Sequence, residues 1–215
     1  MMRNYIIASI LLFFCFGFSS PHIGVIARKN AGGACDQAKD VCAGNEDTQI
    51  TVGESPAKYR AVQFYAQAST TICAADLIMK KNNSPTFNMT VEIWSNNDVS
   101  ADSIDGTDAT LDDDLPSAIV ASGVASGSVA ASGIGATYET VSFTDITGAI
   151  TANNFYWLVI IVDNVGDGTD HMIWGVEASG CDGSPINAEL RSDDDGISWA
   201  DLSNTIATEF QLYSE

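Results

Sequence analysis

The chain has 215 residues, with 28 Asp and Glu against 9 Lys and Arg, so its formal net charge is −19. This length suits one domain, alone or with a short appendage, and a hydrophobic content of 46% is enough to build a sizeable core. The acidity argues against a nucleic-acid partner, because few cations are available to neutralise phosphates.

The first 27 residues have the pattern of an export signal. Arg3 precedes a mostly apolar run of 14 residues, Tyr5–Phe18, which is shorter than the roughly 20 residues of a membrane-spanning helix. Small residues precede two candidate cleavage points, after Ser19 and after Ala27. We therefore predict a signal peptide over residues 1–27, a secreted or cell-surface protein, and no membrane contact after cleavage. An uncleaved anchor is the alternative.

Export would place the remaining cysteines in an oxidising compartment. Without Cys15 an even number is left, namely Cys35, Cys42, Cys73 and Cys181, which predicts two disulfides. Pairing of Cys35 with Cys42 is favoured because a short spacer closes at small entropic cost, although the other pairings stay open. A zinc site is disfavoured, since the sequence contains no Cys-x-x-Cys pair.

The segment 28–54 is polar and rich in Gly and Ala without a sustained period, so we expect a lead-in that holds the first cysteine pair. From residue 59 onward, short runs alternate between apolar and polar residues. Tyr59–Ala68, Ile72–Lys80 and Phe87–Trp94 each have the pattern of a strand. After a polar insertion, such runs resume at residues 118–121, 127–131, 138–143, 155–162, 171–177, 188–191 and 207–213.

The run at residues 155–162 is apolar on both faces, which predicts a central strand that is buried on both sides. No segment of useful length has helical periodicity. We therefore predict an all-β protein whose residues 55–215 form a jelly-roll-like antiparallel β-sandwich of about ten short strands.

Several of these runs are similar to one known family. Leu77–Glu92, with the sequence LIMKKNNSPTFNMTVE, resembles a run of the choice-of-anchor R domain, a module of secreted and surface proteins. The stretches 120–129, 138–157, 171–175 and 191–199 fit further positions of that family. The resemblance covers roughly residues 55–215 and implies a jelly-roll-like sandwich with carbohydrate or surface binding. The insertion Asn96–Pro116 departs from the family pattern, because it is longer and far more acidic.

This insertion is the main candidate for a metal site. Residues 82–190 contain no Lys or Arg but 16 Asp and Glu. Loops rich in carboxylates supply the hard oxygen ligands that Ca²⁺ prefers, and we name as candidate ligands Asp102, Asp105, Asp108, Asp112 and Asp114. A solvated loop is the alternative, because no EF-hand spacing is present. The turn Asp163–Asp170 is a weaker candidate of the same kind.

Ser192–Trp199 fits the Asp-box pattern S-x-D-x-G-x-[ST]-W. In this motif the carboxylate, here that of Asp194, accepts hydrogen bonds from backbone N–H groups of a tight hairpin turn. Gly196 permits the unusual backbone angle, and Trp199 is expected to pack inward. A single copy predicts a structural turn.

Aromatic side chains offer a platform for sugars, because their faces stack on the C–H surfaces of pyranose rings. Trp94 shares a strand face with Glu92, which predicts partial exposure, and Trp174 next to Gly175 is expected to be open as well. We expect Trp157 and Trp199 to lie in the core. The candidate ligand-binding residues are therefore Trp94, Glu92 and Trp174.

Nothing in the sequence indicates an enzyme: it has no G-x-S-x-G motif, and His171 has no evident Ser or Cys partner. We expect a non-catalytic module that binds a glycan or a surface polymer, with Ca²⁺ as the one candidate cofactor. The alternative is a structural subunit whose copies assemble into an extracellular fibre, sheath or coat, with residues 28–54 pairing with an edge strand of a neighbour.

Overall fold

The computed structural model describes residues 36–41, 48–66, 68–97, 115–123, 128–177, 189–203, 207–208 and 210–214. The signal peptide that we predict for residues 1–27 lies outside these ranges. Across the described residues, no helix is of a length and apolarity that would let it cross a membrane.

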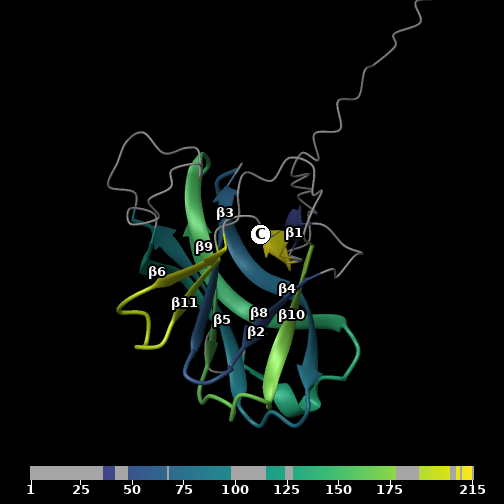
Figure 1. Ribbon diagram of the computed structural model, residues 1–215. Coiled ribbons are helices and arrows are strands. Elements are labelled where there is room, and N and C mark those ends of the chain that lie inside the picture. Colours follow the sequence, from purple (N-terminus) through teal and green to yellow (C-terminus); the bar gives the residue numbers. More distant parts are fainter. Residues whose placement is uncertain are drawn as a thin grey trace, which may run out of the picture.

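The described residues form antiparallel strands and one short 3-10 turn, η2 (Ala131–Gly133), which confirms the predicted all-β sandwich (Figure 1). The first sheet contains β1 (Asp36–Val41), β2 (Thr48–Val52), β4 (Thr70–Asn82), β8 (Glu139–Ile150), β10 (His171–Glu177), β13 (Ala207–Thr208) and β14 (Phe210–Ser214). The second sheet contains β3 (Tyr59–Ala66), β5 (Asn88–Asn96), β6 (Pro116–Gly123), β7 (Val129–Ala130), β9 (Asn154–Val162), β11 (Glu189–Ser192) and β12 (Ala200–Ser203).

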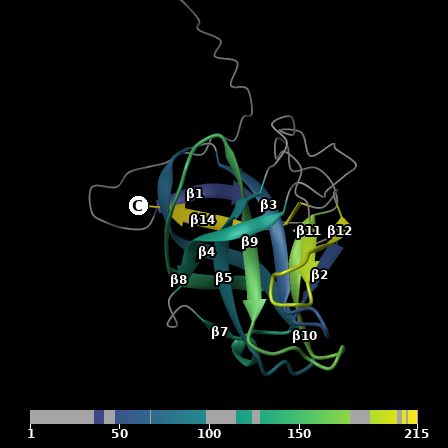
Figure 2. The same cartoon turned by 90° about the vertical axis from the view of Figure 1, so that its left-hand side faces the viewer.

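The two sheets are joined at β8, which pairs with β4 along most of its length and with β6 at Thr147. A Cβ atom at Gly148 would overlap the carbonyl oxygen of Val120 and the backbone of Ala121 on β6. The close approach of β8 to β6 therefore requires glycine at this position. From β6 the second sheet continues in the order β5-β9-β3-β11-β12, and Figure 2 shows β3, β5 and β9 side by side.

Residues 36–41 and 48–52 are part of the sandwich, although their sequence shows no sustained alternation. β1 pairs with β14, and β2 pairs with β10 from Met172↔Val52 to Val176↔Thr48. Both partner strands lie more than a hundred residues further along the chain. The pairing thus depends on tertiary contacts rather than on a local pattern.

The main core lies between the two sheets and is filled by alternate residues of each strand. Its largest fully buried side chains include Trp174, Phe64, Phe143 and Leu158. Phe64 stacks on Tyr156 at a ring-centroid distance of 5.9 Å, and Trp174 meets Phe210 edge-on at 6.4 Å. Such burial of apolar surface is the dominant stabilising contribution in a sandwich of this size.

Truncation of Leu158 tests this core. Leu158 is 0% exposed on the central strand β9, so Leu158→Ala should lower the free energy of unfolding by about 2–5 kcal/mol, measured by urea denaturation. Ile119→Ala on β6 is the control, because that side chain is 53% exposed and should change stability by no more than about 0.5 kcal/mol. Equal losses in the two variants would contradict the placement of the core.

Candidate functional site

A second apolar cluster lies on the outer face of the second sheet, away from the main core. Trp157 and Val159 of β9, Ala61 of β3 and Leu190 of β11 are buried there. Five half-buried side chains pack around them: Tyr59, Trp94, Leu115, Ile161 and Trp199. β9 is therefore covered on both faces, which confirms that it is a central buried strand.

Three of the half-buried side chains are aromatic and meet nearly at right angles. The ring centroids of Trp94 and Trp199 are 6.0 Å apart, and Tyr59 lies 6.5 Å from Trp94 and 6.3 Å from Trp199. The interplanar angles are 84°, 76° and 88°, the edge-to-face arrangement that aromatic quadrupoles favour. We call Tyr59, Trp94, Trp199 and the adjoining Glu92 the aromatic face.

Glu92 is the carboxylate of this face. Its Oε2 atom accepts a hydrogen bond of 2.7 Å from the indole Nε1 of Trp94, two residues along β5. Burial raises the pKa of Glu92, and the bond from Trp94 opposes that rise by stabilising the charged form. The indole and the carboxylate therefore hold one another in a fixed orientation on the strand.

The hydroxyl of Tyr59 lies in a negative environment. Burial raises the pKa of Tyr59 most strongly, and the nearby carboxylates of Asp195 and Glu92 raise it further. Tyr59 keeps its proton at neutral pH and can donate it in a hydrogen bond.

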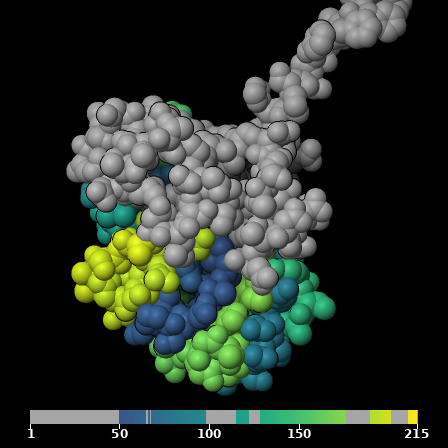
Figure 3. All heavy atoms as spheres, in the orientation of Figure 1, coloured from purple at the N-terminus to yellow at the C-terminus, as the bar shows by residue number. Residues whose placement is uncertain are grey.

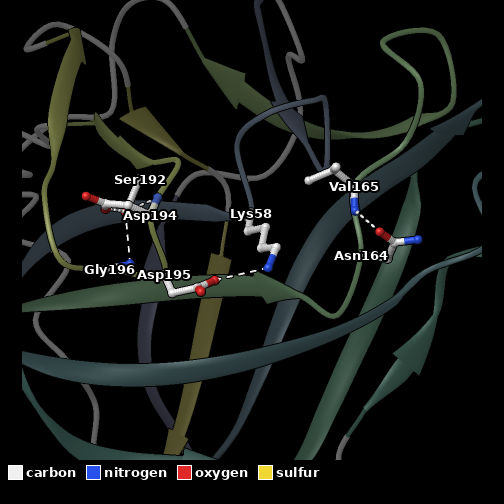
Figure 4. Close-up of polar contacts among 7 residues, drawn as sticks. All are labelled: Lys58, Asn164, Val165, Ser192, Asp194, Asp195 and Gly196. Atoms are coloured by element: carbon white, nitrogen blue, oxygen red, sulfur yellow. Dashed lines mark hydrogen bonds and ion pairs between the residues drawn. The ribbon is translucent and has the colours of Figure 1, made fainter.

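The turn of the Asp-box hairpin has the predicted hydrogen bonds and backbone angles, and Figure 4 shows the bonds that join Ser192 to Asp194 and Gly196. Asp194 accepts bonds from the backbone N–H of Ser198 at 2.8 Å, from the Ser198 hydroxyl at 2.6 Å and from the Ser192 hydroxyl at 2.8 Å. The Ser192 hydroxyl also accepts a bond from the backbone N–H of Gly196 at 2.9 Å. Asp195 and Gly196 have φ angles of +59° and +81°, the left-handed region that the turn requires.

This hairpin rests against the aromatic face. A Cβ atom at Gly196 would lie 3.0 Å from Cη2 of Trp94 and 3.7 Å from Cζ2 of Trp199. Lys58, just before β3, forms an ion pair with Asp195 at 3.1 Å (Figure 4). In Figure 3 the yellow atoms of the β11–β12 region lie at the surface beside dark blue atoms of the chain around β3. The hairpin thus forms one border of the face.

The acidic insertion leaves and rejoins the sandwich next to the same face. Asn96 accepts a 2.7 Å bond from the indole Nε1 of Trp157, and the backbone N–H of Asn97 donates to the carbonyl oxygen of Leu115 at 2.8 Å. Leu115 itself packs against the outer cluster. The two ends of the insertion are therefore fixed together beside the outer cluster. The Ca²⁺ ligands that we predict within it, Asp102, Asp105, Asp108, Asp112 and Asp114, lie outside the described residues.

The weaker metal candidate, Asp163–Asp170, uses its carboxylates in local hydrogen bonds. Asp163 accepts two bonds from Asn88, and Asp170 accepts one from the backbone of Ser84. Asp167 closes its own turn with Thr169. Within the described ranges, no group of three or more His, Cys, Asp or Glu could hold a metal ion. This turn therefore ties neighbouring loops together.

The prediction of an open Trp174 is wrong, because this side chain is 0% exposed. It projects with Met172 into the main core, where its ring fills the volume between the sheets. The prediction for Trp199 is also wrong, because this side chain is half-buried on the aromatic face rather than in the core. Trp157 is fully buried, as expected, and Trp94 is half-buried, as expected.

Tyr59 is a residue of the face that sequence analysis did not select. Its only signal was its position at the start of the alternating run 59–68, on the same strand face as Ala61. Its pairing with Ser192 brings it beside the Asp-box hairpin, and no local pattern contains that information.

Cys73 lies half-buried on β4 and is engaged in a disulfide bond. The other cysteines, Cys35, Cys42 and Cys181 among them, lie outside the described residues. The structure therefore identifies no pair, and the pairing stays a prediction.

The Asp-box carboxylate predicts an acid-sensitive hairpin. Hydrogen bonds from Ser198 and then Ser192 lower the pKa of Asp194 from 3.8 to about 2. Because the folded state binds this proton less readily, the stabilisation is present above pH 3.8 and is lost as the pH falls towards 2. Asp194→Asn should lower the midpoint of unfolding at pH 7, as followed by tryptophan fluorescence. In this variant the midpoint should also fall less steeply as the pH is lowered from 3.8 to about 2.

Asp193→Asn is the matched control, because it removes the same charge from the exposed neighbouring position. It should keep both the midpoint and the acid decline of the parent protein. A midpoint for Asp194→Asn equal to that of the control at pH 7 would contradict the role assigned to the carboxylate.

Comparisons with family models, with curated proteins and with solved structures find no match to this chain. What the protein does must therefore be argued from the residues of the aromatic face and its two borders.

Proposed function

We propose that this protein is an exported, non-catalytic β-sandwich module that binds carbohydrate outside the cell or at its surface. The observation that carries the proposal is the aromatic face, in which the rings of Tyr59, Trp94 and Trp199 pack together and Trp94 holds the carboxylate of Glu92 in one orientation. Aromatic rings contribute apolar contact with the C–H surface of a sugar, and a fixed carboxylate accepts hydrogen bonds from its hydroxyl groups.

The site stands on rigid elements, which favours binding. Glu92 and Trp94 lie on β5, an interior strand of the second sheet. Trp199 is the last residue of a hairpin turn that internal hydrogen bonds hold in shape. Rigid side chains lose little conformational entropy when a ligand binds.

The export signal and the resemblance to choice-of-anchor R domains support the extracellular part of the proposal. Both favour a secreted or surface module, for which glycans and surface polymers are the available ligands. Stabilisation of the acidic insertion by Ca²⁺ remains part of the proposal, since its seven Asp residues lie between two ends that are fixed together.

The environment of His171 supports a non-catalytic role. The side chain is 8% exposed, and its Nε2 atom lies 3.3 Å from the side-chain amide of Asn82. A buried imidazole facing an amide is poorly placed to activate a nucleophile or to reach a substrate in solution.

Removing one ring of the face should weaken binding. A glycan array first identifies an oligosaccharide that the protein binds. We expect Trp94→Ala to weaken the affinity for this oligosaccharide at least tenfold, as measured by titration calorimetry. The variant loses both the contact of the ring with the sugar and the hydrogen-bond partner of Glu92. Tyr213→Ala is the control, since Tyr213 is a half-buried aromatic on β14 of the opposite sheet. Unchanged affinity in a folded Trp94→Ala protein would exclude the aromatic face as the binding site.

A structural subunit that assembles into a fibre, sheath or coat is the alternative function. β1 ends the strand order of its sheet and pairs with β14 on one side only among the described residues. A peripheral strand of this kind can pair with a strand of another copy.

The mass of the secreted protein in solution separates the two functions. For a binding module, we expect light scattering to give the mass of one cleaved chain, both with Ca²⁺ and after a chelator is added. Large assemblies that dissociate on chelation would favour the structural subunit, with the acidic insertion as a metal-bridged contact.

A further inference from the structure

The charge around the aromatic face is the basis for an inference about the kind of sugar that the face binds. Among the described residues, ion pairs join Lys58 to Asp195 and Arg60 to Glu189, and Glu92 takes part in neither. The hydrogen bond from the neutral indole of Trp94 uses one of the two carboxylate oxygens of Glu92. Glu92 thus presents a half-buried carboxylate whose negative charge no ion pair among the described residues neutralises.

The border of the face adds charge of the same sign. Asp193, Asp194 and Asp195 form the Asp-box turn, whose Gly196 lies against the rings of Trp94 and Trp199, and Lys58 forms an ion pair with Asp195. Several carboxylates of one sign around a partly apolar site raise the local concentration of cations.

The rings of the face favour a cation for a separate reason. The face of an indole or phenol ring carries negative charge from its quadrupole, and a cation within about 6 Å of the ring centroid is attracted to it. Tyr59, Trp94 and Trp199 provide three such rings in contact with one another, and the ring of Trp94 is bonded to the carboxylate of Glu92. An ammonium group on a sugar would satisfy both features, because the pyranose contacts the rings while the charge reaches Glu92.

We propose that the aromatic face binds amino sugars that carry a free, protonated amine, as in a de-N-acetylated glucosamine polymer. This inference rests on the proposed function and narrows it. N-acetylation would remove the charge that Glu92 recognises, and a uronic acid would bring a carboxylate into an already negative site.

The test compares three oligosaccharides of equal length on the full mature protein: a glucosamine hexamer, its N-acetylated form and an oligogalacturonate. We expect the glucosamine hexamer to bind at least tenfold more tightly than the N-acetylated form, with an affinity that falls as salt is added. We expect no binding of the galacturonate. Equal or tighter binding of either of the latter two ligands would overturn the inference.

Glu92→Gln tests the carboxylate itself. The amide oxygen of Gln can still accept the bond from Trp94, so the fold and the ring positions are kept while the charge is removed. We expect binding of the glucosamine hexamer to weaken about tenfold or more and binding of the N-acetylated hexamer to change little.

Asp76→Asn is the matched control, because Asp76 also accepts a 2.7 Å bond from an aromatic side chain, that of Tyr213. Both residues lie on the first sheet, away from the aromatic face. This variant should bind the glucosamine hexamer as the parent protein does. Equal losses in Glu92→Gln and Asp76→Asn would show that overall charge attracts the ligand, which would overturn the inference.

The two proposals fail in different ways. If a neutral glycan binds through Trp94 while the glucosamine hexamer does not bind, the amino-sugar inference is wrong and carbohydrate binding stands. If no glycan in the array or among these oligomers binds, the proposed function fails together with the inference.

Discussion

The burial of β9 on both faces is the constraint on which the second sheet depends. Trp157, Leu158, Val159 and Ile160 are all 0% exposed, so apolar groups must cover both sides of the strand. The inner side packs into the main core, and the outer side requires a second cluster. Burial of Trp157 on that outer side also requires an acceptor for its indole N–H, which Asn96 provides at the point where the acidic insertion begins.

The aromatic face follows from the way this second cluster ends. Towards solvent the cluster is bordered by side chains with an apolar body and a polar tip, and Tyr59 and Trp94 fit that requirement. At the margin the indole N–H of Trp94 is bonded to Glu92, and the hydroxyl of Tyr59 lies in the field of Asp195 and Glu92. The side chains that we propose to bind a ligand are thus the ones that cover the second cluster at its solvent-facing edge.

Local interactions made much of this structure predictable from sequence. The Asp-box hairpin depends on bonds within seven residues, and β10 has the predicted bounds of residues 171–177, because both follow from patterns along the chain. β1 and β2 could not be predicted, since their partners are distant strands. The sequence predictions for Trp174 and Trp199 are wrong because alternation shows that the two faces of a strand differ, while tertiary packing decides which face is covered.

A strongly acidic surface is compatible with this fold because the carboxylates nearest the rings have local partners. Asp194 is held by Ser192 and Ser198, Asp195 by Lys58, and Glu92 by the indole of Trp94. The partners of Asp194 and Glu92 are neutral donors, so they fix these carboxylates without cancelling their charge. The negative field therefore remains available to a cation in solution, while hydrogen bonds already hold the groups that produce it in place. The same bonds that make the hairpin and the β5 carboxylate rigid thus leave the negative charge of these groups in place.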